Sequence, residues 1–339
     1  MALEKKDKIA VIILNWNGAS LLRRYLPSVV ANTNSDIADV IVADNGSSDN
    51  SLQVLADEFA DVEVLRFEQN YGFAEGYNKA IELTNYKYTL LLNSDVRVPK
   101  GWIEPLYEYM ELHPEVGACQ PKLLKDHDGE DEIFEYAGAA GGFLDCHGYP
   151  YCRGRVFSEV EADHGQYDGE PIEIFWATGA ALMVRSEVYL KAGGLDSFFF
   201  AHMEEIDLCW RIHLLGYNIK AVMESKVYHL GGGSLPASNP RKTYLNFRNN
   251  LFLLYKNLPK GEGKRMLIVR RLYDTLSFFM FVATMQWGNA KAVLKAHGDY
   301  RKFKARYDGV QPDANLLATM PGAQRNIVLD FYLRGKKKF

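Results

Sequence analysis

Residues 9–120 alternate short apolar runs with segments of helical periodicity, and no other feature of the chain constrains the fold as strongly. Residues 9–14 are apolar without a break, which is typical of a strand buried on both faces. Residues 20–30 follow with apolar side chains at helical spacing. Repeated alternation of this kind predicts a mostly parallel sheet with helices on both faces, so the predicted fold class is α/β.

The same patterns give the extent of each element. Strands are predicted over residues 9–14, 39–43, 62–67, 88–92, 116–120, 179–184 and 218–222. Helices are predicted over residues 20–30, 49–59, 74–83, 101–112, 186–192 and 204–215. Residues 121–172 are rich in Gly, Asp and aromatic residues, which predicts loops with a hairpin. Residues 240–306 are predicted to be mostly amphipathic helix.

The composition limits the partners and the compartment. The chain has 339 residues and a net charge of −4, so no basic field attracts nucleic acid. Its four cysteines form no CxxC pair, and we expect reduced thiols in a cytoplasmic protein. A zinc site made by Cys146, His147, Cys152 and His164 is an alternative, but the spacing matches no common zinc pattern. No stretch reaches the length needed to span a bilayer.

Polar segments rich in Asn and Asp follow four of the predicted strands. They are Asn15-Trp16-Asn17, Asp44-Asn45-Gly46-Ser47, Asn70-Tyr71-Gly72 and Asn93-Ser94-Asp95. Ligands of open α/β sheets bind at the carboxyl ends of the strands. These segments therefore predict one polar ligand site at that edge of the sheet.

Two residues of these segments suit the recognition of a nucleotide base. A carboxylate at Asp44 can accept a hydrogen bond from a pyrimidine N–H, and Trp16 can stack on the ring. The alternative interpretation is that residues 44–47 form a plain turn leading into a helix cap. The sequence leaves both interpretations open.

Asp95 and His229 are candidate ligands for a divalent cation. Asp95 follows the strand predicted over residues 88–92, and its carboxylate can bind Mg²⁺ or Mn²⁺ that bridges diphosphate oxygens. His229 precedes the glycine run 231–233 and can complete this site or contact a phosphate. The alternatives are a solvated aspartate and a structural histidine.

Three carboxylates occur together at the start of the helix predicted over residues 204–215. Glu204, Glu205 and Asp207 closely follow the aromatic run 198–200. Acidic residues stabilise a helix N-terminus, which is the plainer interpretation. Crowded carboxylates beside apolar walls also raise one pKa toward the range of a general base, which favours a catalytic role.

Together, eight segments of the chain resemble family 2 glycosyltransferases, especially the bacterial rhamnosyltransferase-like and galactofuranosyltransferase-like branch. They occur in the family's order, with compatible spacing, between about residues 9 and 255, so the set is far more specific than any one segment. The segments are VIILNWNG (11–18), IVADNGSSD (41–49), NYGFAEGYN (70–78), LLLNSD (90–95), TGAALMVR (178–185), GGLDSFFF (193–200), EEIDLCWR (204–211) and YHLGGGS (228–234).

The resemblance implies a Rossmann-like GT-A catalytic domain over residues 1–240 and a helical C-terminal extension over residues 241–339. The donor-binding half would cover about residues 1–120 and the acceptor-binding half about residues 121–240. The implied reaction transfers a sugar, with inversion at the anomeric carbon, from dTDP-rhamnose or a UDP-sugar. The implied acceptor is a hydroxyl of a cell-surface polysaccharide or a lipid-linked glycan.

The resemblance also implies roles for single residues. Glu205 lies where the family has the aspartate that deprotonates the acceptor, with Glu204 beside it and Asp207 as a helper. Asp95 and His229 match the family's ligands for a divalent cation, Mg or Mn. The implied donor-binding residues are Asn15, Trp16, Asn17, Asp44, Asn45, Asn70, Gly72, Asn78, Asn93 and Asp95. The implied acceptor-binding residues are Trp176, Thr178 and Gly179.

Two positions depart from the family's pattern. The metal motif begins with Asn93, a neutral ligand, which is expected to weaken metal binding. The base position is Glu205, one methylene longer than aspartate. The first departure keeps open a catalytically silent glycan- or nucleotide-binding protein. A sugar-phosphate nucleotidyltransferase is a further alternative, but residues 15–18 lack the lysine that its phosphate loop needs.

The C-terminal third alternates apolar stretches with Arg and Lys. Residues 244–255 are expected to pack on the catalytic domain. Residues 266–287 gather Phe278, Phe279 and Trp287, and we expect this segment to contact a membrane surface or a partner chain. The protein would then be peripheral at the inner face of the cytoplasmic membrane, or a homo-oligomer.

Overall fold

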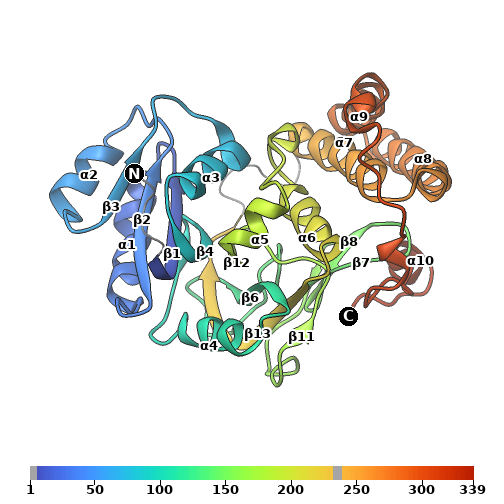
Figure 1. Ribbon diagram of the computed structural model, residues 1–339. Coiled ribbons are helices and arrows are strands. Elements are labelled where there is room, and N and C mark those ends of the chain that lie inside the picture. The colour runs from blue at the N-terminus through green and yellow to red at the C-terminus, as the bar shows by residue number, and fades with distance from the viewer. Residues whose placement is uncertain (1–5, 232–238) are drawn as a thin grey trace.

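The computed structural model describes residues 6–231 and 239–339, and a nine-stranded mixed sheet forms its centre (Figure 1). The strands of this sheet are β1 (Lys6–Asn15), β2 (Ala38–Asp44), β3 (Glu63–Arg66), β4 (Tyr86–Asn93), β5 (Val96–Arg97), β6 (Val116–Lys125), β11 (Ile172–Glu173), β12 (Ala181–Arg185) and β13 (Asn218–His229). Their order is β11-β13-β6-β12-β4-β1-β2-β3, and β5 pairs with β13 beside this path. The β4-β1-β2-β3 half is parallel throughout, and β12 is antiparallel to both neighbours.

Helices cover both faces of the sheet. They are α1 (Ala19–Asn32), α2 (Ser51–Glu58), α3 (Gly72–Glu82), α4 (Glu104–Leu112), α5 (Ser186–Lys191) and α6 (Glu204–Leu214). Alternate residues of β1 divide between two cores: Ile9, Val11 and Ile13 pack with α1, α2 and α4, whereas Ala10 and Ile12 pack with α3, α5 and α6. A strand buried on both faces explains the unbroken apolar run, and the predicted α/β class is confirmed.

Residues 121–172 hold more structure than the loops and hairpin that their composition predicts. A second, antiparallel sheet has the order β10-β9-β8-β7 and consists of β7 (Gly142–Leu144), β8 (Pro150–Cys152), β9 (Arg155–Val156) and β10 (Glu159–Val160). Each of these strands has only two or three residues, too few for a readable periodicity. The β7–β8 pair is the predicted hairpin.

The C-terminal extension is helical, as predicted, and lies at one end of the molecule (Figure 1). Its helices are α7 (Pro240–Asn257), α8 (Lys260–Ala283), α9 (Trp287–Phe303) and α10 (Ile327–Tyr332). Within the described part of the chain, no helix combines the length and the apolar character needed to cross a bilayer.

The register of the parallel strands brings their polar ends to one edge. Asn15 at the end of β1 pairs with Asp44 at the end of β2, and Leu14 pairs with Asn93 at the end of β4. Strand ends that are about 30 and 80 residues apart in the sequence therefore lie side by side on neighbouring strands. This edge is where the sequence predicts the ligand site.

Candidate active site

A fixed carboxylate lies between the ends of β1 and β2. Asp44 is buried, and its Oδ2 accepts a hydrogen bond from Nδ2 of Asn15 at 3.0 Å. Its Oδ1 accepts a second from the backbone N–H of Ser47, also at 3.0 Å. The turn interpretation and the ligand interpretation of residues 44–47 are thus compatible, because the bonds that close the turn also orient the carboxylate.

Asn17 and Trp16 extend this edge toward solvent. Oδ1 of Asn17 accepts hydrogen bonds from the backbone N–H groups of Ser48 at 2.7 Å and Asp49 at 3.2 Å, which clamps the loop after β1 to the loop after β2. The Trp16 side chain is 56% exposed. An exposed indole at the rim of a polar site is available to stack on a planar ring.

Asn45 ties the loop that precedes α3 to the same edge. Its Nδ2 donates to Oδ1 of Asn70 at 3.1 Å and to the carbonyl oxygen of Gly72 at 3.0 Å. Its Oδ1 accepts a hydrogen bond from the backbone N–H of Tyr71 at 3.0 Å. Asn45, Asn70 and Gly72 therefore shape the wall of the predicted donor pocket through contacts with one another.

Asn78, on α3, forms hydrogen bonds within the protein. Its Oδ1 accepts hydrogen bonds from the Tyr189 hydroxyl at 2.6 Å and the Leu195 N–H at 2.9 Å, and its Nδ2 donates to the Leu195 carbonyl at 2.8 Å. The amide thus fastens residues 193–195 to α3. Both ends of the amide are engaged within the protein, so Asn78 has a structural role, and its predicted donor contact stays a prediction.

Asp95 and His229 meet where β13 ends. Oδ1 of Asp95 lies 3.1 Å from Nε2 of His229, and Nδ2 of Asn93 lies 3.3 Å from the same nitrogen. On the other side of the ring, Oε1 of Glu135 is 3.5 Å from Nδ1. Burial alone lowers the pKa of His229, but Asp95 and Glu135 outweigh it and raise the pKa to about 10.

These side chains fit a divalent cation. Asp95 and the amide oxygen of Asn93 offer hard oxygen ligands, and His229 offers a borderline nitrogen, a set that suits Mn²⁺ or Mg²⁺. Two carboxylates that favour a proton on His229 would equally favour a cation at Nε2. Glu135 then occupies the outer position that orients a ligating histidine. Glu135 was not predicted from the sequence, because it lies in a loop and has no local pattern.

A tightly constrained segment leads into the carboxylates of α6. Phe200, His202 and Met203 have positive φ values of 68°, 68° and 74°. In this segment and directly after it, three buried side-chain atoms have no hydrogen-bond partner within the described chain: Nε2 of His202, Oε2 of Glu204 and Oε2 of Glu205. Unpaired buried polar atoms are costly, and in a cleft they indicate groups that a polar ligand would satisfy. His202 has no motif of its own and was not predicted.

The environment of the two glutamates raises their pKa values. Burial raises the pKa of Glu205 from 4.5 to about 7. Burial and the adjacent Glu205 charge raise the pKa of Glu204 well above its usual range. The pair therefore holds one proton readily near neutral pH, the behaviour of a general base that operates at pH 7 to 8.

Glu205 borders the same sheet edge as Asn93. A β-carbon placed on Gly179 would lie 4.0 Å from Cβ of Glu205. The next residue, Ala180, accepts a hydrogen bond from the Asn93 N–H at 3.0 Å. Gly179 is thus a close neighbour of the predicted base, and a side chain there would also lie 3.1 Å from the Phe73 ring.

Asp207 is bound by partners on α6 and α7. It is fully buried, and its Oδ2 pairs with Arg211 at 2.7 Å and with Lys256 at 2.9 Å. Its Oδ1 accepts a hydrogen bond from Nδ2 of Asn257 at 2.8 Å. These cations hold the pKa of Asp207 below its usual value despite the burial. Asp207 therefore links α6 to α7, and its predicted role as a helper of the base stays a prediction.

Two of the three predicted acceptor residues lie inside the protein. Trp176 is buried, and its Nε1 donates to the Phe143 carbonyl at 3.0 Å. Thr178 is also buried, and its N–H donates to Oε1 of Gln120 at 3.0 Å. These contacts support the segment that leads to Gly179, and their predicted contact with an acceptor stays a prediction.

The alternative zinc site is not assembled. Sγ of Cys146 lies 3.3 Å from Nδ1 of His147, but Cys152 is buried against Arg155 and His164 is exposed. Asp145, which joins Cys146 and His147 in a compact trio, already accepts hydrogen bonds through both carboxylate oxygens.

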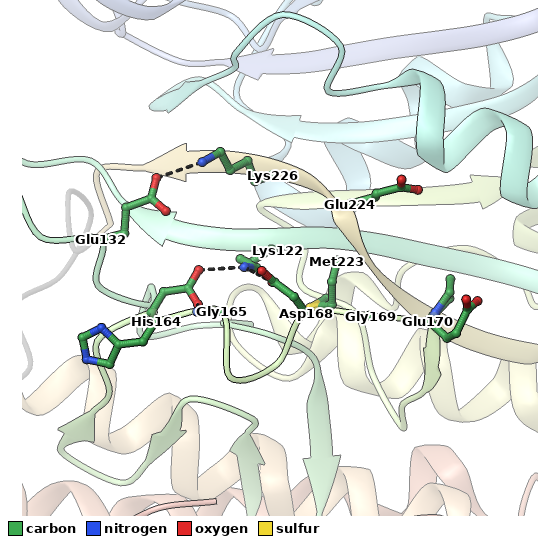
Figure 2. A pocket seen from close by; sticks show the side chains of 12 residues that line it. Lys122, Glu132, His164, Gly165, Asp168, Gly169, Glu170, Met223, Glu224 and Lys226 are labelled. Atoms are coloured by element: carbon green, nitrogen blue, oxygen red, sulfur yellow. Dashed lines mark hydrogen bonds and ion pairs between the residues drawn. The ribbon is translucent and has the colours of Figure 1, made fainter.

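The cavity drawn in Figure 2, with a volume of about 700 Å³, lies over β6 and β13 and not at the polar edge. Its basic groups are paired with its acids: Lys122 with Asp163 at 2.7 Å, and Lys226 with Glu132 at 2.9 Å. None of the predicted donor, acceptor or catalytic residues lines it.

Known proteins resemble this chain in sequence. Residues 10–132 match the model of the family "Glycosyl transferase family 2". An N-acetylglucosaminyl-diphospho-decaprenol L-rhamnosyltransferase of Mycobacterium tuberculosis is 25% identical over 239 residues, which cover 66% of this chain and 76% of the relative. A low-salt glycan biosynthesis hexosyltransferase, Agl10, of Haloferax volcanii is 24% identical over 292 residues, which cover 81% of this chain and 82% of the relative.

Solved structures share the fold. GalNAc-T7, crystallised with UDP, GalNAc and Mn²⁺, has a TM-score of 0.58 at 17% identity, and the match covers 90% of this chain and 57% of that one. S. aureus TarS 1-349 has a TM-score of 0.53 at 15% identity, and the match covers 90% of this chain and 83% of that one. Residues 10–132 are therefore similar to glycosyl transferase family 2, and the chain has a GT-A-like fold with additional C-terminal helices.

Proposed function

We propose that this protein is an inverting, metal-dependent glycosyltransferase that moves a sugar from a nucleotide-diphosphate donor to a hydroxyl group. The observation that carries the proposal is Glu205. Its carboxylate has an unpaired buried oxygen and a pKa raised to about 7, and its β-carbon lies beside Gly179, whose neighbour Ala180 is hydrogen-bonded to Asn93 at the polar edge. Few environments other than an active site hold a carboxylate in this way.

In the proposed reaction, Oε2 of Glu205 takes the proton of the acceptor hydroxyl. The hydroxyl oxygen forms a bond to the anomeric carbon of the donor sugar, and the bond from that carbon to the diphosphate breaks on the opposite side. The nucleoside diphosphate leaves with the electron pair, so the anomeric configuration inverts. The pKa of Glu204, raised by burial and by the adjacent Glu205 charge, favours its neutral form and so limits the charge beside the base.

The donor would bind along the ends of β1, β2 and β4. Asp44 is oriented to accept a base N–H, and Trp16 is exposed to stack on the base. A divalent cation, Mg²⁺ or Mn²⁺, held by Asp95, His229 and the amide of Asn93, would neutralise charge on the leaving diphosphate. The mycobacterial relative is an L-rhamnosyltransferase, which favours dTDP-rhamnose as the donor, and a UDP-sugar is the second candidate.

The acceptor would be a lipid-linked glycan or a growing polysaccharide, reached at the inner face of the cytoplasmic membrane. An exposed apolar surface on α8 and the α8–α9 turn supports this place. It comprises Ile268, Leu272, Leu276, Phe279, Met280, Met285 and Trp287. Residues 275–290 carry no charge, whereas residues 260–304 hold ten Lys or Arg and three Asp or Glu in a chain of net charge −4. A basic segment with an apolar tip complements an anionic bilayer.

Flotation with liposomes rich in anionic lipid tests the membrane contact. We expect the protein to float at low salt, and Phe279→Asp combined with Trp287→Asp to abolish flotation. Leu112→Asp, which changes an exposed leucine on α4, serves as the matched control. A protein that stays entirely in the soluble fraction contradicts the membrane contact. Loss of a dimer in the double variant, without any flotation, would assign the surface to a second copy of the chain.

A donor panel scored by the release of nucleoside diphosphate tests the activity. We expect release with one dTDP- or UDP-sugar, stimulated by Mn²⁺ or Mg²⁺ and abolished by Glu205→Gln. Calorimetry with nucleoside diphosphates then separates the alternatives. A catalytically silent binding protein would bind the nucleotide without turnover with any donor and acceptor.

A further inference from the structure

The segment that presents the predicted base has a backbone that needs restraint from outside. Phe200, His202 and Met203 have positive φ values, and none of them is glycine. Such conformations persist only where surrounding contacts over-determine them. Met203 is also the N-terminal cap position of α6, so a change of its backbone would move Glu204 and Glu205 directly.

A single buried amide on α7 supplies much of this restraint. Asn249 is fully buried, and its Nδ2 donates to the carbonyl oxygens of Phe199 at 2.9 Å, Ala201 at 2.9 Å and His202 at 2.7 Å. These three carbonyl oxygens all accept hydrogen bonds from one side-chain amide, which is not the pattern of a regular helix or strand. Their convergence fixes the path of residues 199–202.

The neighbouring Arg248 fixes both the amide and the start of the segment. Its Nε donates to Oδ1 of Asn249 at 2.8 Å, which keeps Nδ2 of that amide turned toward the segment. Its Nη2 donates to the carbonyl oxygens of Phe198 at 3.0 Å and Phe199 at 2.9 Å. Charge-assisted donors of this kind hold carbonyl groups more firmly than neutral ones.

We propose that Asn249 and Arg248 are positioning residues for the general base: they lock residues 198–203 so that Glu205 faces the acceptor. The proposal rests on the proposed function, in which Glu205 is the base. It means that the first helix of the C-terminal extension completes the active site, and that residues 1–240 alone lack this restraint. Neither residue needs to touch substrate, because both act through the carbonyl groups of the segment.

The test compares Asn249→Ala with Asn250→Ala. Asn250 is the adjacent buried asparagine, but its Nδ2 donates to the Gly148 carbonyl at 2.7 Å, away from the segment. We expect Asn249→Ala to lower kcat at least tenfold, with nucleoside diphosphate affinity within twofold of wild type. The apparent pKa of the base in the pH–rate profile should fall toward that of a free glutamate. Asn250→Ala should leave kcat and the pH profile unchanged at temperatures where it is folded.

Arg248 provides the second pair of variants, which also decides the question if Asn249→Ala does not fold. Arg248→Lys keeps the charge and can still donate to one carbonyl oxygen, so we expect it to retain more of kcat than Arg248→Ala. Wild-type kcat and pH profile in Arg248→Ala, or equal loss in Asn249→Ala and Asn250→Ala, would overturn the proposal.

A readout without turnover separates this proposal from the proposed function. The pH-dependent difference in stability between the wild type and Glu205→Gln reports how deeply Glu205 is held from water. We expect that difference to shrink in the Asn249→Ala or Arg248→Ala background. A shrinking difference in a protein that transfers no sugar would uphold the positioning role and refute the transferase. An unchanged difference would refute the positioning role.

Discussion

Replacing Glu205 by Gln should abolish transfer and, at the same time, stabilise the protein at alkaline pH. Glutamine keeps the shape of the side chain but cannot accept the acceptor proton. Loss of a general base costs about 10²- to 10⁴-fold in rate. Donor binding should be unchanged, since the predicted donor contacts lie at and after the ends of β1, β2, β3 and β4 and not on α6.

The stability gain follows from the pKa of the buried carboxyl. The pKa of Glu205 is raised from 4.5 to about 7, so the folded protein binds its proton more tightly than the unfolded chain does. Folding stability is therefore lost as pH rises from about 4.5 to 7. One unit of pKa corresponds to about 1.4 kcal/mol, so the wild type loses up to about 3 kcal/mol over this window, whereas Glu205→Gln does not.

Thermal unfolding at pH 4 and pH 8 measures this effect. Unfolding entropy of about 2 cal/mol/K per residue converts 3 kcal/mol into roughly 4 °C for a chain of 339 residues. We expect Glu205→Gln to match the wild type at pH 4 and to melt up to about 4 °C higher at pH 8. Equal melting temperatures at pH 8 would refute a desolvated Glu205, and wild-type transfer would refute its role as the base.

Asp207→Asn is the matched control, because it changes a carboxylate on the same helix for which we expect the opposite effect of pH on folding stability. Arg211 and Lys256 hold the pKa of Asp207 below its usual value, so its ionised form stabilises the fold above that value and this stabilisation is lost as pH falls through it. Removing the charge leaves Arg211 without its carboxylate partner, while Lys256 keeps only Asp196, and we expect a loss of about 3 kcal/mol at pH 7.

Three further predictions address the sheet edge. Gly46→Ala should lower the free energy of unfolding by at least about 2 kcal/mol, because Gly46 has φ 72° and a β-carbon would lie 2.5 Å from the Gln69 backbone. Gly101→Ala is the control: Gly101 has φ 75° but open space around it, so chemical denaturation should show a loss of only about 1 kcal/mol. Trp16→Ala should weaken nucleoside diphosphate binding by about 1 to 3 kcal/mol in calorimetry, and unchanged affinity would exclude stacking. Asp95→Ala should remove the stimulation by Mn²⁺, as a chelator does to the wild type, and stimulation that survives would exclude Asp95 as a ligand.

The order of strands and helices and the polar edge were readable from the sequence. Their signals are local: residues 9–14 are apolar without a break because β1 is buried on both faces, and Asp44 and Asn93 follow such runs directly. The carboxyl ends of parallel strands must share one edge, so the meeting of these loops follows from the fold class. The short strands of residues 142–160 gave no such signal, because two or three residues carry no period.

Only the tertiary structure decided which polar side chains are free to act. Glu205 and Asp207 look alike in the sequence, yet Asp207 is neutralised by cations from α6 and α7 while Glu205 keeps an unpaired buried oxygen. Asn78 and Asn249 are likewise ordinary asparagines until the carbonyl groups they bind are known. Residue type and local pattern fix what a side chain can do, but its partners come from segments distant in the chain. Burial and charge, which set its pKa, are properties of that assembled surrounding.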